Sequence, residues 1–243
     1  MARLIFGFSF TLLTLICFCQ NGFAQNGEKP KEKDITSRIS ATTDFSVTKK
    51  FDFAFSQEVR LNQNLGKVNS HLTEASVGYK VFKWLNTGLT YRFTKRFEPE
   101  ANNKHRLYGI LGVEYQFEPI KTEFGARVRV EREWIHDEDG VEGDIRPRIS
   151  AAYKNKNIRF EPGVSAEFFW TKKQEETKYV YSRYRLRAGL DYKITKHHEV
   201  SGYYAYQSEE KKKSIEVIHI IGLSYTYKLN LYKKGKKKIP SNI

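Results

Sequence analysis

Apolar and polar residues alternate along most of the chain beyond residue 50. In residues 51–61, Phe51, Phe53, Phe55 and Val59 fall on one face of an extended chain, and most intervening residues are polar. A period of two predicts β-strands with one apolar and one polar face. Several of these segments reach the 9 to 11 residues that a tilted strand needs to cross a bilayer. The same alternation recurs within residues 75–81, 89–93, 107–117, 124–130, 145–153, 158–170, 180–192, 200–206 and 217–227.

The connections between these segments alternate in length. Short turns are expected at residues 83–85, 118–120, 154–157 and 195–197, and longer charged loops at residues 62–70, 98–104, 136–143, 172–178 and 208–213. Outer-membrane barrels have short periplasmic turns and longer outer loops. We therefore predict an all-β, antiparallel up-and-down transmembrane β-barrel of about ten strands over residues 51–232. Residues 37–47 also alternate, so twelve strands is the alternative, because an even number leaves both ends periplasmic.

The N-terminal segment predicts export. Residues 4–19 are the only long apolar run, and they follow Arg3 and precede a short polar stretch around Ala24. This order is typical of a signal peptide, so we expect residues 1–24 to be cleaved near Ala24. Both cysteines, Cys17 and Cys19, lie inside this segment. The mature chain therefore has no disulfide, thiol nucleophile or thiolate metal site.

Tyrosines recur at the strand ends that enter the short turns, at intervals of 35 to 39 residues. A ring of tyrosines at one height predicts the aromatic girdle of a membrane barrel, although tyrosine is also common in ordinary sheets. Four glycines, Gly88, Gly112, Gly189 and Gly222, fall on the opposite face, where they would make room for bulky neighbours. The predicted girdle consists of Tyr79, Tyr115, Tyr153, Tyr192, Tyr225 and Tyr227.

Short motifs resemble a known family. They are the run Glu58-Val59-Arg60-Leu61-Asn62-Gln63-Asn64, the strand Tyr91-Arg92-Phe93, the arginine-rich strands, and the closing Gly222-Leu223-Ser224-Tyr225-Thr226-Tyr227. Together these are similar to the uncharacterised outer-membrane β-barrel family named domain of unknown function 2490. The closing segment also resembles the signal read by the barrel-assembly machinery, although Lys228 to Ile243 follow it. The resemblance implies a barrel and no activity.

If the apolar face meets lipid, the polar face lines the lumen. Arginine and glutamate nearly balance there, and the planar guanidinium suits crowded pairing with carboxylates. Two interpretations follow: an ionic core that fills the lumen in a structural role, or a narrow channel for small anionic solutes, centred on Arg183, Arg185 and Arg187. The predicted lumen residues are Arg60, Arg92, Arg106, Arg127, Arg129, Arg146, Arg148, Arg183, Arg185, Arg187, Glu58, Glu74, Glu114, Glu131, Glu161 and Glu167.

The motif search favours a protein without catalysis. No H-E-x-x-H, G-x-S-x-G or P-loop pattern occurs, so we expect no enzyme, cofactor or metal. An acidic outer loop from Asp137 to Asp144 does not have the spacing of an EF-hand. Two alternatives remain: a secreted soluble β-sandwich or lipocalin-like carrier, and a barrel-wall lipid hydrolase that uses His71 or His105.

Charge and hydropathy fit an envelope protein. The net charge is +14 and the mean hydropathy is −0.61. A barrel shows only alternate residues to lipid, so low hydropathy does not contradict a membrane location. Residues 25–50 are expected to be an extension or an extra strand, and residues 233–243 a basic tail. We expect the cell outer membrane, with its lipids, lipopolysaccharide and the barrel-assembly machinery as partners, and no nucleic acid. The sequence does not indicate the oligomeric state.

Overall fold

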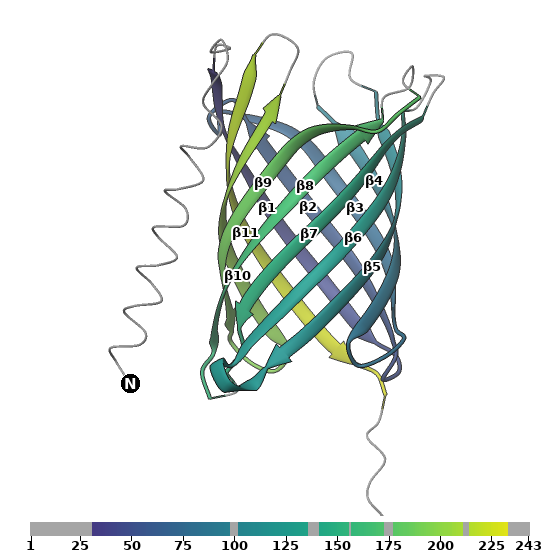
Figure 1. Ribbon diagram of the computed structural model, residues 1–243, viewed down its shortest axis with the longest axis vertical. Coiled ribbons are helices and arrows are strands. Elements are labelled where there is room, and N and C mark those ends of the chain that lie inside the picture. Colours follow the sequence, from purple (N-terminus) through teal and green to yellow (C-terminus); the bar gives the residue numbers. More distant parts are fainter. Residues whose placement is uncertain are drawn as a thin grey trace, which may run out of the picture. The chain divides into compact units, whose positions relative to one another are not determined.

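The computed structural model describes residues 31–97, 102–135, 141–155, 157–172, 177–210 and 214–232, which form one closed β-barrel of eleven strands (Figure 1). The predicted signal peptide and the basic tail from residue 233 lie outside these residues. No helix in the described ranges is long and apolar enough to cross a membrane. The strands are β1 (Lys31–Ser46), β2 (Phe51–Asn62), β3 (Lys67–Lys80), β4 (Leu85–Arg96), β5 (Lys104–Phe117), β6 (Thr122–Ile135), β7 (Val141–Tyr153), β8 (Phe160–Lys172), β9 (Val180–Lys193), β10 (His198–Glu210) and β11 (Ile215–Asn230).

The barrel closes through a parallel pair of strands. Neighbours in sequence pair antiparallel, but β1 pairs with β11 in parallel, from Lys31 opposite Ile215 to Ser46 opposite Asn230. Each tight turn reverses the chain, so in a ring with an odd number of strands the first and last strands run the same way. The predictions of ten and of twelve strands are therefore wrong. Residues 37–47 belong largely to β1, so part of the predicted extension is a wall strand.

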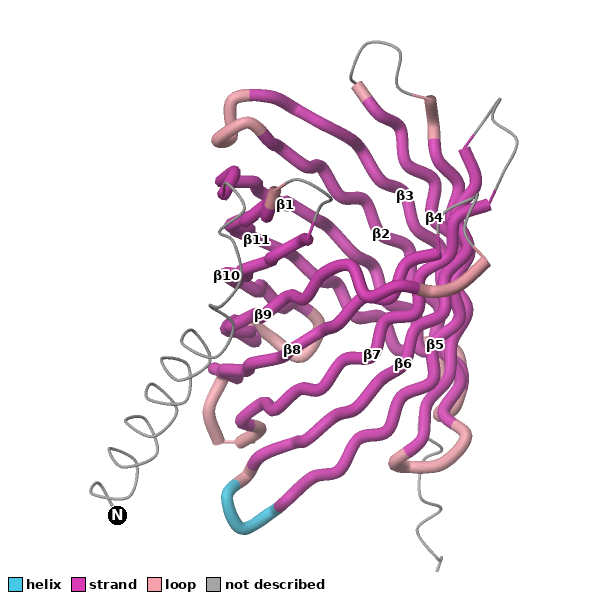
Figure 2. The backbone as a smooth tube through the Cα atoms, turned by 45° about the horizontal axis from the view of Figure 1, so that its top comes forward, coloured by secondary structure: helices cyan, strands magenta, loops and turns pink. Residues whose placement is uncertain are grey.

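The two ends of the barrel differ in their connections (Figures 1 and 2). At one end the strands are joined by short segments, residues 47–50, 81–84, 118–121, 154–159 and 194–197, as the sequence predicts at four of these places. We call this the short-turn end. At the opposite, long-loop end, β7 and β10 each extend three residues into the predicted loops, and β8 extends one.

One connection at the long-loop end is much tighter than predicted. Residues 62–70 are not a loop: β2 and β3 are joined by residues 63–66 alone. Gln63, Asn64 and Leu65 all have positive φ values, 52°, 55° and 69°. The backbone N–H of Asn64 donates to Asp34 Oδ1 of β1 at 3.0 Å, which stabilises this unusual turn.

The wall has its apolar face outside and its charged face inside. Outward side chains such as Leu111, Ile149 and Leu223 are more than half exposed, whereas the charged Glu131 and Glu167 on the inner face are buried. This is the reverse of a soluble barrel or sandwich, which buries its apolar face as a core. The described fold is a single closed sheet and contains no second packed layer.

Two prolines inside strands are accommodated at one seam. Pro147 pairs with Val128 of β6, but the β7–β8 ladder skips from Ile145 opposite Trp170 to Arg148 opposite Glu167. Pro162 pairs with Leu190 of β9 and has no partner on β7. Because proline lacks an N–H, each interrupts one ladder while the other side of its strand stays paired.

Two of the four predicted inward glycines, Gly189 and Gly222, make room for the large side chain of Tyr203, whereas a Cβ at Gly88 would meet only backbone atoms. Tyr203 of β10 lies opposite Gly222 of β11 and Gly189 of β9. A Cβ added at Gly222 would overlap the Tyr203 ring, and one at Gly112 would lie 2.6 Å from Asn86 Oδ1. The missing side chains thus let the Tyr203 ring lie flat against the inner wall.

Candidate functional site: the charged lumen

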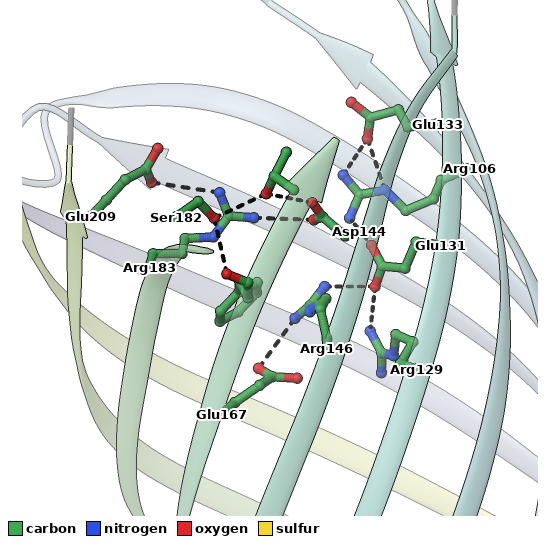
Figure 3. A network of polar contacts seen from close by, with 12 residues as sticks. Arg106, Arg129, Glu131, Glu133, Asp144, Arg146, Glu167, Ser182, Arg183 and Glu209 are labelled. Carbon is green, nitrogen blue, oxygen red and sulfur yellow. Dashed lines mark hydrogen bonds and ion pairs between the residues drawn. The ribbon is translucent and has the colours of Figure 1, made fainter. Parts of the chain in front are cut away.

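The structure gathers about half of the predicted lumen residues into a connected polar network. The ten arginines and six glutamates lie on strands β2 to β9, on the inward parity of each strand. Their partners come mainly from β5 to β10, so the network occupies one side of the interior (Figure 3).

Glu131 is the centre of this network. Its carboxylate, on β6, is 1% exposed and accepts hydrogen bonds from Arg106 at 2.8 Å and Arg146 at 2.7 Å (Figure 3). Arg129 adds a third contact at 3.4 Å. These arginines come from three neighbouring strands, so one carboxylate ties β5, β6 and β7 together from inside.

Glu167 of β8 is a second centre. Its oxygens lie 3.2 Å from Arg146, 3.4 Å from Arg185 and 3.5 Å from Arg127. Arg185 also donates to Gln207 of β10 at 3.0 Å. Arg146 bridges Glu131 and Glu167, and the ion pairs therefore run without a break from β5 to β9.

Towards the long-loop end the network continues through side chains that the sequence did not single out. Glu133 accepts from Lys104 at 2.7 Å and from both Arg106 Nε and Nη2. Arg183 lies 3.3 Å from Asp144 and 3.6 Å from Glu209 (Figure 3). A cavity of about 20 Å³ among Arg106, Glu131, Glu133, Glu142, Gly143 and Asp144 is the size of a single water site.

The position of Asp144 corrects the expectation of an acidic outer loop. Asp144 lies in β7 and points into the barrel, where Thr171 donates to it at 2.6 Å. Asp137 to Asp139 lie outside the described residues. In the described part of the chain, no group of three or more His, Cys, Asp or Glu side chains is placed to hold a metal.

Three aromatic rings pack among the arginines. Phe169 of β8 is fully buried, and the guanidinium carbons of Arg146, Arg183 and Arg185 lie 4.3, 4.4 and 5.1 Å from its ring centroid. The Tyr108 ring lies 4.3 Å from Arg129, and Tyr203 lies 3.7 Å from Arg187. Stacking on ring faces holds guanidinium groups without a second carboxylate. The lumen is thus an aromatic and ionic core.

Arginines also face one another directly across strand pairs. Arg129 lies opposite Arg146, and Arg127 lies opposite Arg148. Like charges in register destabilise a strand pair unless counter-charges intervene. Glu131 forms ion pairs with Arg129 and Arg146, and Glu167 forms one with Arg127. Arg148 has no salt bridge to any described residue, so positive charge is in excess at this level.

The remaining predicted lumen residues lie outside the central network. Arg60 pairs with Glu58 on its own strand at 2.6 Å, and Arg92 pairs with Glu74. Glu161 pairs with Lys154 at 2.6 Å and with Lys193 near the short-turn end. Glu114 is exposed at that end.

Lysines as well as arginines contribute to the rim of the lumen at this end. Burial lowers the pKa of the Lys154 ammonium. The hydrogen bond to Glu161 and the charges of Glu123 and Asp191 outweigh burial and raise the pKa above its usual value. Lys154 therefore stays charged at neutral pH and closes the rim with Glu161.

The six predicted girdle tyrosines lie at the strand ends near the short turns, on the outward parity. Tyr79 packs on Phe51 and Tyr192 on Phe160, each with ring centroids 4.7 Å apart. Their role as a membrane girdle remains a prediction.

Three outward histidines are paired with tyrosines. Tyr91 Oη lies 2.7 Å from His105 Nδ1, and Tyr204 Oη lies 2.7 Å from His219 Nδ1. His198 makes the same contact with Tyr225. His71 also lies on the outer face, opposite Val59. The hydrogen bonds satisfy polar rings on an otherwise apolar wall.

The sequence interpretation missed several members of the network because pairing depends on register. Tyr108 has the same parity as Arg106, and Phe169 has the same parity as Glu167, so strand parity alone could have placed both rings inside. Which arginine meets which carboxylate could not be inferred, since partners lie on different strands. The missed members are Lys104, Tyr108, Glu133, Asp144, Phe169, Tyr203, Gln207 and Glu209.

Comparison with known proteins gives a family and a distant structural likeness. A family model described as "Protein of unknown function (DUF2490)" matches residues 39–217. No curated protein matches the chain. Among solved structures, the chain is similar to outer-membrane expressed OmpT of Vibrio cholerae at 12% identity and a TM-score of 0.38. That match covers 65% of this chain and 54% of the other, about half its length. The family description names no activity.

Proposed function

Because the chain belongs to the DUF2490 family of proteins of unknown function, its role must be inferred from its own geometry, and we propose a non-enzymatic outer-membrane β-barrel with a filled, ion-paired lumen. The role is structural: the barrel contributes a stable protein element to the membrane and conducts little or nothing. Its partners are the membrane lipids and lipopolysaccharide, with the barrel-assembly machinery acting during biogenesis.

The observation that carries the filled lumen is the burial of Glu131 and Phe169 at its centre. Both are 1% exposed or less, although they lie on the inner face of the wall. An open pore would leave such side chains hydrated. Instead Arg106, Arg129 and Arg146 converge on Glu131. Breaking buried ion pairs of this kind is strongly unfavourable, so the plug is expected to persist.

The location is supported by the outer face of the wall. Exposed apolar side chains continue around the barrel, among them Phe53 on β2, Val130 on β6 and Leu190 on β9. A soluble protein rarely exposes a continuous apolar surface of this extent. Closed barrels are the β-structures that satisfy all backbone hydrogen bonds inside a bilayer.

Three measurements test this proposal. Fractionation should recover the protein with outer membranes, and boiled and unboiled detergent samples should migrate differently, because a folded barrel resists denaturation. Purified protein in planar bilayers should give no steady unitary conductance. Release by osmotic shock, or equal mobility with and without boiling, would exclude the membrane barrel. Steady conductance of the wild-type protein would exclude the filled lumen.

A narrow path for small anions is the second candidate, and the excess of positive charge favours it. Arg148 and Arg187 have no salt bridge to the described residues, and Arg187 is held only by the Tyr203 ring. Rings of arginine favour anions in pores. If the lumen conducts, Arg185→Ala should lower the unitary conductance or reduce its preference for chloride over potassium. A conductance indifferent to Arg185→Ala would rule out this path.

A further inference from the structure

The outer wall has a hollow over β4, β5 and β6, of which β5 and β6 cross the front right of Figure 1. Its floor is Gly109 of β5, which faces outward between Leu89 of β4 and Val130 of β6. A Cβ at Gly109 would have no atom within 4 Å, so the missing side chain opens the space. The hollow measures about 360 Å³, within the range of ligand pockets, and is lined by Leu89, Leu107, Tyr108, Gly109, Val130, Arg132 and Trp134.

Arg132 gives this apolar hollow a positive charge at its edge. It lies two residues beyond Val130 on β6, faces outward and is exposed. No hydrogen bond or salt bridge joins its guanidinium to the residues that the structure describes. An unpaired guanidinium on the lipid face is costly at the bilayer centre and tolerated near its edge. Arg132 is three residues from the end of β6, so it belongs to the edge at the long-loop end.

Aromatic side chains mark the same height. The rings of His105 and Trp134 stack 5.9 Å apart with an interplanar angle of 8°, and Tyr91 binds His105. Such rings are typical of the headgroup region. The order along the wall is therefore an apolar hollow, then a cation, then an aromatic cluster. A membrane lipid has its acyl chain and its phosphate in the same order, so the chain would lie over the hollow and the phosphate at the cation.

We propose that this hollow binds lipopolysaccharide, with an acyl chain over Gly109 and a lipid phosphate on Arg132. The inference rests on the proposed outer-membrane location, in which the long-loop end faces the outer leaflet where this lipid resides. Arginine forms two parallel hydrogen bonds to a phosphate, which fits a fixed lipid better than bulk membrane. The Arg132 guanidinium has no ion pair with a described residue, so its complementarity to a phosphate points to an anionic lipid, and the long-loop end points to its leaflet.

The test compares lipid binding by purified barrels. Wild type, Gly109→Leu, Arg132→Gln, Arg132→Lys and Gly202→Leu are stripped of lipid in detergent and titrated with lipopolysaccharide, with bound lipid counted by native mass spectrometry. Gly109→Leu fills the hollow and Arg132→Gln removes the charge, so each should weaken binding about tenfold or more. Arg132→Lys should retain part of the affinity.

Gly202→Leu is the matched control. Gly202 faces outward on β10 between Leu190 and Leu223, and a Cβ there also meets nothing within 4 Å. The same substitution at this site should leave binding unchanged. Different mobility of boiled and unboiled samples identifies variants that have folded.

The proposal would be overturned if all folded variants bound lipopolysaccharide equally well. It would also be overturned if the wild-type barrel bound phosphatidylglycerol as tightly as lipopolysaccharide, or more tightly, and if neither Gly109→Leu nor Arg132→Gln weakened that binding. Fractionation distinguishes failure of the proposed lipid site from failure of the proposed outer-membrane location. A wild-type barrel recovered outside the outer membrane contradicts the location, whereas a correctly located barrel with variant-independent binding contradicts the lipid site alone.

Discussion

At the scale of single residues, the barrel shows how a carboxylate is kept buried inside a closed sheet. Glu131 loses nearly all of its hydration, and the cost is offset only because Arg106, Arg129 and Arg146 all reach it. Arg146 is itself held by Glu167 and by the face of Phe169. Arg129 Nε, Arg146 Nε and Glu167 Oε1 are already buried without a hydrogen-bond partner among the described residues. Removal of one member would therefore leave still more buried groups unpaired.

Glu131→Gln should therefore destabilise the barrel by about 3–5 kcal/mol, the usual result of removing one partner from a buried ion pair. The measurement is urea unfolding of protein refolded into lipid vesicles. Glu199→Gln is the control, because its partner Lys228 is 41% exposed and a solvated pair contributes at most about 1 kcal/mol. Equal losses for the two variants would show that the Glu131 network does not stabilise the fold.

At the scale of strands, much of the wall follows from the sequence and its closure does not. Alternation predicted segments that lie largely in β2 to β11, and their inward faces, because a period of two records which residues share one face of a strand. Alternation did not establish β1 as a strand of the wall, since its parallel pairing with β11 depends on residues about 180 positions away. It also extended one loop over residues 67–70, where β3 continues with polar residues beyond the apolar band.

The parallel seam can be tested by an engineered disulfide, because Cys17 and Cys19 both lie in the predicted signal peptide. Ser40 of β1 lies directly opposite Ser224 of β11. The double variant Ser40→Cys/Ser224→Cys should form a disulfide under mild oxidation, seen as a reducible shift in gel mobility. Ser40→Cys/Ser201→Cys places the thiols two strands apart, about 10 Å, which is too far for a disulfide. Failure of the first pair to cross-link would contradict the eleven-stranded closure.

At the scale of the whole molecule, the fold inverts the usual distribution of polarity. The apolar face points outward, and the interior takes the role of a core while being built from arginine, glutamate and three aromatic rings. Side chains alone fill the interior of an eight-stranded barrel, and an eleven-stranded barrel is wider. Bulky aromatic rings are therefore needed to fill the rest of its lumen. Phe169 has the central place, with three guanidinium groups around it.

Removal of that ring should open the lumen. Phe169→Ala deletes a fully buried side chain and leaves space lined by Arg146, Arg183 and Arg185, so planar bilayers should show conductance steps above the wild-type level with a preference for chloride over potassium. Phe168→Ala is the matched control, because Phe168 directly precedes Phe169 on β8 but faces outward and is 37% exposed. If both variants conduct alike, or if Phe169→Ala favours potassium, the arginines around Phe169 do not line the space that ions cross. The sign of the selectivity therefore tests the charge of the lumen independently of its width.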